Sequence, residues 1–185
     1  MRIIAGAWRG RTLTAPPGTG TRPTADRLRQ ALFDMLLHAP WGGRDSIVGV
    51  QVLDVFAGTG ALGLEALSRG ANHATFVEID PIALTALRAN VAACRAERVS
   101  EVLALDVLAV SRGKPAGLVF LDPPYGRALI PPALSRLRAA GRLLSGALVV
   151  AETAQGEPSP LSAEPIQALD ERTHGKGRLT IWREP

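Results

Sequence analysis

From about residue 50 onward, short apolar runs alternate with segments of helical pattern. Apolar runs of this length indicate buried strands, and their alternation with helices predicts a doubly wound, mostly parallel sheet. The chain is therefore expected to belong to the α/β class, with a Rossmann-like sheet. The expected strands cover residues 50–56, 74–79, 99–105, 118–121 and 147–151, and the expected helices cover residues 61–69, 81–94 and 132–140.

Both ends of the chain depart from this alternation. Strand-like runs over residues 2–5 and 11–14 predict a hairpin with Trp8 near its tip, followed by a helix over residues 25–37. At the other end, residues 166–171 and 178–182 flank the segment His174–Gly177 and predict an antiparallel hairpin that closes the sheet.

These patterns divide the chain into two parts. Residues 1–46 are expected to form a small N-terminal extension of hairpin and helix, and residues 47–185 the α/β domain. With 185 residues the chain can bury a full core.

The net charge of +4 is concentrated in the extension. Residues 1–29 hold six arginines against the single acid Asp26, whereas the remainder has 15 basic and 16 acidic residues. A local basic cluster favours contact with a polyanion, although a solvated surface arm remains the alternative. The arginines are Arg2, Arg9, Arg11, Arg22, Arg27 and Arg29.

Composition also excludes some classes of protein. No run approaches the ~18 apolar residues of a membrane span, and the first residues lack the long apolar core of a signal peptide. The single cysteine, Cys94, allows no internal disulfide and is expected to be a buried structural thiol. We therefore expect a cytoplasmic protein with no membrane partner.

A glycine-rich loop follows the first strand of the α/β domain, in the stretch Asp54-Val55-Phe56-Ala57-Gly58-Thr59-Gly60. Gly58 and Gly60 let a ligand approach the backbone closely. With Gly63 the stretch also matches the dinucleotide fingerprint, and Glu78 lies where a ribose-binding acid is expected. On this loop alone, a dehydrogenase remains a rival interpretation.

Further acids favour a different ligand. Asp54 lies ahead of the glycines, where it would repel a pyrophosphate and attract an ammonium group. Asp106 follows the third strand and suits an adenine amine, although a helix cap is a strong alternative for this residue. Acids at the ends of four parallel strands are expected to line one crevice.

The fourth expected strand ends at Asp122-Pro123-Pro124-Tyr125. The two prolines remove two N–H donors and hold the backbone extended, so that the Pro123 carbonyl can face a pocket. Tyr125 supplies a flat face on which a base can stack. An acceptor, a carbonyl and an aromatic ring together suit a planar ring that carries an exocyclic amine.

These motifs together resemble class I S-adenosylmethionine-dependent methyltransferases that act on amino groups. More narrowly, the chain resembles the RsmD family, bacterial 16S ribosomal RNA guanine-N2 methyltransferases, from residue 1 to about residue 152. The N-terminal strings make the resemblance specific, because generic methyltransferases lack them, and it is weak after Gly156. The matching strings run from Arg2 to Gly6, Trp8 to Arg11, Arg22 to Arg27, Asp54 to Gly70, Glu78 to Asp80 and Asp122 to Tyr125.

The resemblance implies a role for each motif. Asp54 would lie near the methionine end of S-adenosyl-L-methionine, Glu78 would bind the ribose and Asp106 the adenine. Catalysis would fall to Asp122, Pro123, Pro124 and Tyr125. The implied cofactor-binding residues are Asp54, Phe56, Ala57, Gly58, Thr59, Gly60, Ala61, Glu78, Ile79, Asp106 and Val107, and the implied RNA-binding residues are Arg2, Arg9, Arg11, Arg22 and Arg27.

The expected partner is 16S rRNA, as free RNA, as the 30S subunit or as an assembly intermediate, bound by a monomer. No metal is expected, and His38, His73 and His174 are interpreted as structural or surface residues. Two alternatives remain: an amino-methyltransferase acting on DNA bases, and a non-catalytic RNA-binding protein with a degenerate cofactor fold.

Overall fold

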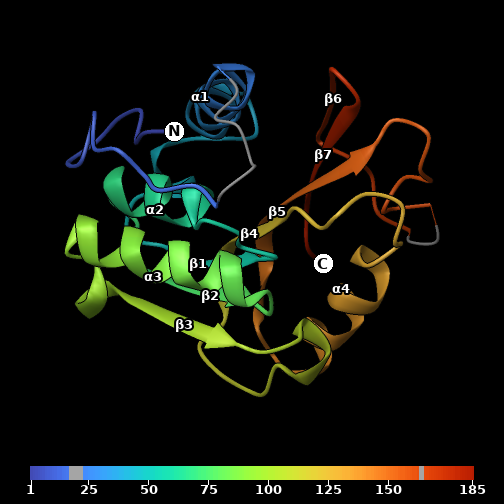
Figure 1. Cartoon of the computed structure of the whole chain (residues 1–185). Helices are drawn as coiled ribbons and strands as arrows, with labels where there is room; N and C mark the ends of the chain where they lie inside the picture. Colours follow the sequence, from blue (N-terminus) through green and yellow to red (C-terminus); the bar gives the residue numbers. More distant parts are fainter. Residues whose placement is uncertain (17–22, 163–164) are drawn as a thin grey trace.

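The computed structural model describes residues 1–16, 23–162 and 165–185. Within these parts, seven strands form one sheet in the order β3-β2-β1-β4-β5-β7-β6. Strands β1 to β5 are parallel, and β7 lies antiparallel between β5 and β6 (Figure 1). This confirms the predicted α/β class and the closing hairpin. The strands are β1 (Gln51–Val55), β2 (His73–Glu78), β3 (Ser100–Ala104), β4 (Ala116–Leu121), β5 (Leu143–Ala154), β6 (Asp170–His174) and β7 (Gly177–Arg183).

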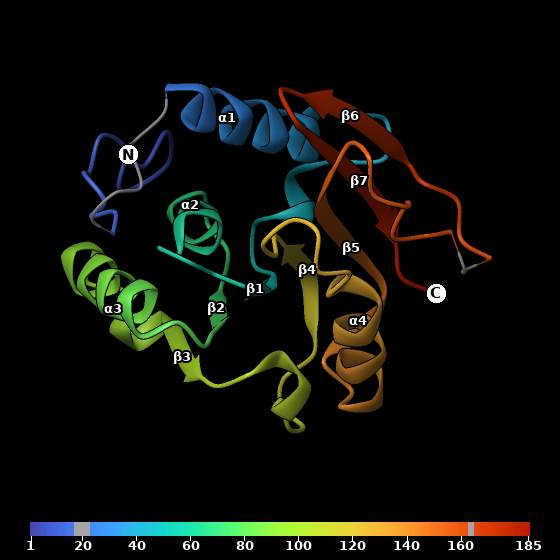
Figure 2. The same ribbon diagram turned by 45° about the vertical axis from the view of Figure 1, so that its right-hand side comes forward.

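Helices cover both faces of the sheet, because successive strand residues point to opposite sides and both sides are apolar. Val52 and Phe120 pack on the side of α1, α2 and α3, whereas Leu53 and Val119 pack on the side of α4 (Figure 2). The helices are α1 (Pro23–His38), α2 (Ala61–Ser68), α3 (Pro81–Cys94) and α4 (Ile130–Ala139), and short 3₁₀ turns cover η1 (Arg44–Ser46), η2 (Glu97–Val99) and η3 (Val107–Ala109).

The start of α3 follows the capping pattern expected from the sequence. The Asp80 carboxylate accepts hydrogen bonds from the Ile82 and Ala83 amides at 2.9 and 2.8 Å, and Pro81 occupies the first turn.

Cys94, at the other end of α3, is a buried free thiol, as predicted, and burial raises its pKa. Among the described residues, no helix is both long and apolar enough to span a bilayer.

The C-terminal hairpin lies later in the chain than predicted. Its first strand was expected over residues 166–171 but is β6, Asp170–His174, which turns at Gly175 into β7. The segment Asp-Glu-Arg-Thr-His has no apolar alternation, because an edge strand pairs through its backbone and buries little side-chain surface. Pairing with β7 also extends β5 to Ala154, beyond the apolar run that predicted it.

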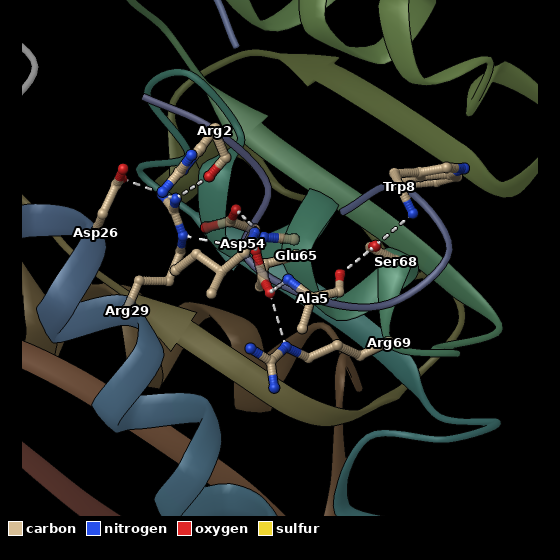
Figure 3. Close-up of polar contacts among 11 residues, drawn as sticks. Arg2, Ala5, Trp8, Asp26, Arg29, Asp54, Glu65, Ser68 and Arg69 are labelled. Carbon is tan, nitrogen blue, oxygen red and sulfur yellow. Dashed lines mark hydrogen bonds and ion pairs between the residues drawn. The ribbon is translucent and has the colours of Figure 1, made fainter. Parts of the chain in front are cut away.

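The N-terminal hairpin forms, but its two strands are reduced to one antiparallel bridge between Arg2 and Thr12. The reason is that the amides of Ile4 and Ala5 donate to the Glu65 carboxylate of α2 at 2.8 and 3.0 Å, instead of to a partner strand (Figure 3). The hairpin therefore lies against α2.

Trp8, near the tip of the hairpin, is also held against α2. Its amide donates to Ser68 Oγ at 3.0 Å, and its ring is half-buried against the main core (Figure 3). A Cβ at Gly6 would lie 1.8 Å from the Ser68 carbonyl oxygen, so only glycine allows this close approach.

The N-terminal residues share a core with the sheet. Ile3 and Leu13 of the hairpin and Phe33 of α1 pack in one cluster with Phe76 and Phe120. The rings of Phe33 and Phe120 have centroids 5.9 Å apart. The two parts are therefore packed together, and the proposal that residues 1–46 form a separate RNA-binding part concerns function.

Candidate active site

The C-terminal ends of β1 to β5 open into one cleft of about 1340 Å³. Residues of α1 and of the turn between β6 and β7 complete its walls. The cleft brings together all four residues predicted as catalytic, Asp122, Pro123, Pro124 and Tyr125. The predicted cofactor residues that line it are Asp54, Phe56, Ala57, Gly58, Thr59, Ala61, Glu78, Ile79, Asp106 and Val107.

Gly60 is the one predicted cofactor residue that does not line this cleft. A Cβ at Gly60 would lie 2.4 Å from Leu87 Cδ1, and its φ is 76°, so packing and the turn both require glycine. At Gly58, with φ 56°, the nearest atom to a Cβ would be the Phe56 carbonyl oxygen at 4.0 Å. Gly58 therefore faces open space, where a ligand can approach the backbone.

Asp54 lies at the floor of the cleft and is only 2% exposed. Burial raises its pKa to about 8; the Gly63 amide, which donates to Oδ2 at 2.8 Å, partly offsets this, and the charges of Asp122 and Glu78 raise it further. A cationic group beside Asp54 would favour its ionised form. The position therefore suits the cationic end of a ligand.

Glu78 holds the glycine loop and keeps capacity for a ligand. Its Oε2 accepts from the Gly58 amide at 2.7 Å, and its Oε1 accepts from the amides of Ile79 and Asp80 at 2.8 and 2.9 Å. A carboxylate has sites for about four donors. One site thus remains for a hydroxyl in the cleft.

Asp106 caps the N-terminus of η3, which was the alternative interpretation of this residue. It also lines the cleft. Its Oδ1 accepts from the Leu108 amide at 2.9 Å at the start of η3. Ile79 and Leu108 line the same cleft with 61% and 51% of their surface exposed. Exposed apolar side chains beside a carboxylate suit a flat ring that carries an amine.

Asp122 lies just after β4, with its side chain open to the cleft. The surrounding protein still removes much of its water. This burial raises the pKa of Asp122 to about 7, and the charge of Glu152 contributes in the same direction. The carboxyl group therefore changes charge near neutral pH.

Two residues of the cleft, Glu152 and His174, were not identified from the sequence as site residues. The Tyr125 hydroxyl donates to Oε1 of Glu152, and His174 Nε2 lies 3.7 Å from the same oxygen. Glu152 and His174 both line the cleft, and His174, interpreted from the sequence as a structural or surface residue, is partly exposed there. Burial and the hydrogen bond to Glu152 raise the pKa of Tyr125.

The N-terminal extension also contributes to the cleft. Leu28, Arg29 and Leu32 of α1 line it. Arg29 is only 5% exposed, donates to the Arg2 carbonyl and to Asp26 Oδ1, and lies 3.7 Å from Glu65 (Figure 3). Burial lowers the pKa of Arg29.

The predicted RNA-binding arginines separate into three groups. Arg2, Arg9 and Arg27 are exposed and line a second groove of about 490 Å³ between the hairpin and α1. Arg11 is exposed but donates to the Ala93 carbonyl of α3. Arg22 lies outside the described residues.

Known proteins resemble this chain in sequence and in fold. The family model described as conserved hypothetical protein 95 matches residues 1–183. A ribosomal RNA small subunit methyltransferase D from Escherichia coli (strain K12) is 44% identical over 155 residues, which cover 83% of this chain and 74% of that protein. The protein of the same name from Haemophilus influenzae is 39% identical over 181 residues, covering 95% and 89%.

The chain belongs to the RsmD family. A solved structure from Escherichia coli has a TM-score of 0.82 at 36% identity and covers 99% of this chain and 97% of that one. Family membership and fold together make the protein a methyltransferase with the class I fold. The family match continues to residue 183, so it includes the C-terminal hairpin, where the resemblance of individual motifs was weak.

Proposed function

We propose that this protein transfers a methyl group from S-adenosylmethionine to the exocyclic N2 amine of a guanine in 16S rRNA. The observation that carries the proposal is a single cleft that joins the glycine loop and strand-end acids to Asp122-Pro123-Pro124-Tyr125. The names of the two relatives support ribosomal RNA of the small subunit as the substrate.

The residues present fit the cofactor. Asp54 would bind the methionine ammonium, and the remaining acceptor site of Glu78 would take a ribose hydroxyl. Asp106, with Ile79 and Leu108, would hold the adenine. When bound, S-adenosylmethionine supplies an electrophilic methyl group on a sulfonium.

The tetrapeptide after β4 then positions the methyl acceptor. Guanine N2 is a poor nucleophile, because its lone pair is delocalised into the ring. Asp122 and the Pro123 carbonyl accept hydrogen bonds from the amine and hold it in line for attack, with the reacting atoms ~3–3.5 Å apart. The same contacts favour the positive charge that develops on the nitrogen. Tyr125, 44% exposed, offers its ring for stacking on the base.

The RNA would reach the cleft across the N-terminal extension. Arg2, Arg9 and Arg27 lie around the groove beside α1, the helix that also lines the cleft. Phosphates bound there would place the target nucleotide over the cleft, and its base would leave the stack to enter. We further propose that the protein acts as a cytoplasmic monomer.

A radiolabel assay tests the substrate. Tritium transfer from labelled S-adenosylmethionine is measured to 30S particles, to naked 16S rRNA and to DNA. We expect label in the ribosomal RNA, in one or both of its forms, and none in DNA. Label in DNA would instead indicate a DNA amino-methyltransferase, and RNA binding without transfer would indicate a non-catalytic RNA-binding protein.

A further inference from the structure

Glu152 has no role in the reaction as proposed, yet it lies beside Asp122, which is proposed to hold the amine that receives the methyl group. Asp122 and Glu152 directly follow Leu121 and Ala151, which pair in register on the parallel strands β4 and β5. Side chains alternate along strands, so both carboxylates lie on the side of the sheet that α1 covers. Neighbouring strands are about 4.8 Å apart, a spacing that lets two side chains reach one edge of a base.

One oxygen of Glu152 is held in place by its neighbours. Oε1 accepts from the Tyr125 hydroxyl and lies 3.7 Å from His174 Nε2. A Cβ at Gly177 would lie 2.9 Å from Oε1 and 2.8 Å from the Tyr125 hydroxyl, so glycine allows the group to pack this closely. The carboxylate therefore has a fixed orientation.

The other oxygen is open to a ligand. No hydrogen bond to Oε2 is formed by any residue in the described parts of the chain, and Glu152 lines the cleft. An ionised carboxylate only accepts hydrogen bonds. Glu152 Oε2, next to Asp122, is thus a hydrogen-bond acceptor that requires a hydrogen-bond donor on the substrate.

We propose that Glu152 is a specificity-determining residue that selects guanine by accepting a hydrogen bond from its N1–H. This inference rests on the proposed function, in which Asp122 and Pro123 hold the adjacent N2 amine. Guanine is the base that presents a ring N–H beside an exocyclic amine. Adenine N1 and cytosine N3 present lone pairs beside their amines, and these repel a carboxylate that has lost its water.

The test compares two substrates that carry the same methyl-accepting 2-amine. After the methylated position has been mapped with the wild-type enzyme, RNA fragments are made with guanosine or 2-aminopurine there. The 2-aminopurine base keeps the 2-amine but has a lone pair at N1. We expect the wild-type protein to prefer guanosine by about 10²-fold or more in kcat/KM, because a site built around a donor rejects an analogue without it.

Glu152→Gln should then lower this preference at least tenfold, because the amide of glutamine can donate to the N1 lone pair. The matched control is Glu171→Gln, which removes the same charge from exposed β6 and should leave the preference unchanged. An unchanged preference in Glu152→Gln, whatever its overall rate, would overturn the inference.

A second variant keeps the test decisive if Glu152→Gln does not fold. Tyr125→Phe removes the hydroxyl that orients Glu152 and should lower the preference several-fold; an unchanged preference there would also count against the inference. The proposed function fails separately, and earlier, if the wild-type enzyme methylates an atom other than guanine N2.

Discussion

Asp122 accepts hydrogen bonds fully only in its ionised form. Burial raises its pKa to about 7, so the ionised fraction, which is the form required by the proposed mechanism, grows as pH rises through neutrality. We predict that kcat/KM for methyl transfer increases with pH, with a midpoint near 7, because kcat/KM reports the pKa values of the free enzyme. Asp122→Asn should flatten this profile. A midpoint near the ordinary carboxyl value of ~4 would contradict the argument.

Removing the side chain tests the same residue by a different route. Asp122→Ala should lower turnover by about 10²–10³-fold and leave S-adenosylmethionine affinity nearly unchanged, because the lost interaction is strongest in the transition state. Rapid-quench kinetics and calorimetry measure the two quantities. If affinity falls as much as turnover, Asp122 acts mainly by holding the cofactor.

Asp54 gives a stability prediction of defined sign. Its folded pKa of about 8 exceeds the ordinary unfolded value near ~4, so between these values the folded state binds more protons than the unfolded state. The free energy of unfolding therefore falls as pH rises through this window. Asp54→Asn, which can still accept from the Gly63 amide, should raise the Tm of the ligand-free protein at pH 8.

The expected rise in Tm is at least about 2–4 °C, the shift for 1 kcal/mol in a chain of this size. The same change should weaken S-adenosylmethionine binding, because the attraction to a cation is lost. Thermal unfolding at pH 5 is the control, since wild type and variant should differ less there. An equal difference at both pH values would contradict the assigned pKa.

At the residue scale, the sequence showed the acids that follow apolar runs but not their partners. Asp54, Glu78 and Asp122 were identifiable because each ends a recognisable strand near glycine or proline. Glu152 and His174 come together with Tyr125 only through the pairing of β5 with β7 and of β7 with β6. No local pattern marks such a contact.

At the scale of elements, Glu65 joins the N-terminal hairpin to α2. It is completely buried and accepts from two hairpin amides and from Arg69 Nε at 2.7 Å. We predict that Glu65→Gln destabilises the protein by about 3–5 kcal/mol, the usual loss when one member of a buried ion pair is removed. Chemical denaturation and limited proteolysis of the hairpin measure the effect.

Glu97→Gln is the matched control, since Glu97 is exposed in η2. A loss in Glu65→Gln no larger than in this control would show that the hairpin is held by its apolar contacts alone.

The elements differ in how well the sequence predicts them. Strands β1, β2 and β4 are buried on both faces and therefore appear as continuous apolar runs. Edge strand β6 is specified by backbone pairing with β7, and the hairpin bridge by contacts with α2. The α2 partner of the N-terminal hairpin lies 60 residues or more away in the sequence, and β6 carries no apolar pattern, so local composition reveals neither.

At the scale of the whole molecule, the N-terminal extension exposes fewer arginines in its groove than its net charge suggests. Arg29 is buried and Arg11 contacts the Ala93 carbonyl, so the exposed arginines of the second groove are Arg2, Arg9 and Arg27. The sequence shows where charge is concentrated, whereas burial decides which charges are available to a partner.

We predict that Arg9→Ala with Arg27→Ala weakens RNA binding and reduces the slope of log affinity against log salt by about 1.4, at ~0.7 per phosphate contact. Cofactor affinity should be retained. The control is Arg44→Ala with Arg112→Ala, which removes the same charge from exposed positions that precede β1 and β4, at the end of the sheet opposite the cleft. Equal slopes for both double variants would make the groove an ordinary solvated surface.

The most direct measurement of the central claim is the chemical identity of the product. Ribosomal RNA of the small subunit, as particles and as naked RNA, is incubated with the enzyme and S-adenosylmethionine, digested to nucleosides and analysed by mass spectrometry. The structure predicts the formation of N2-methylguanosine by the wild-type protein and its near absence with Asp122→Ala. Methylation of any other atom, or an equal yield from the variant, would contradict the account.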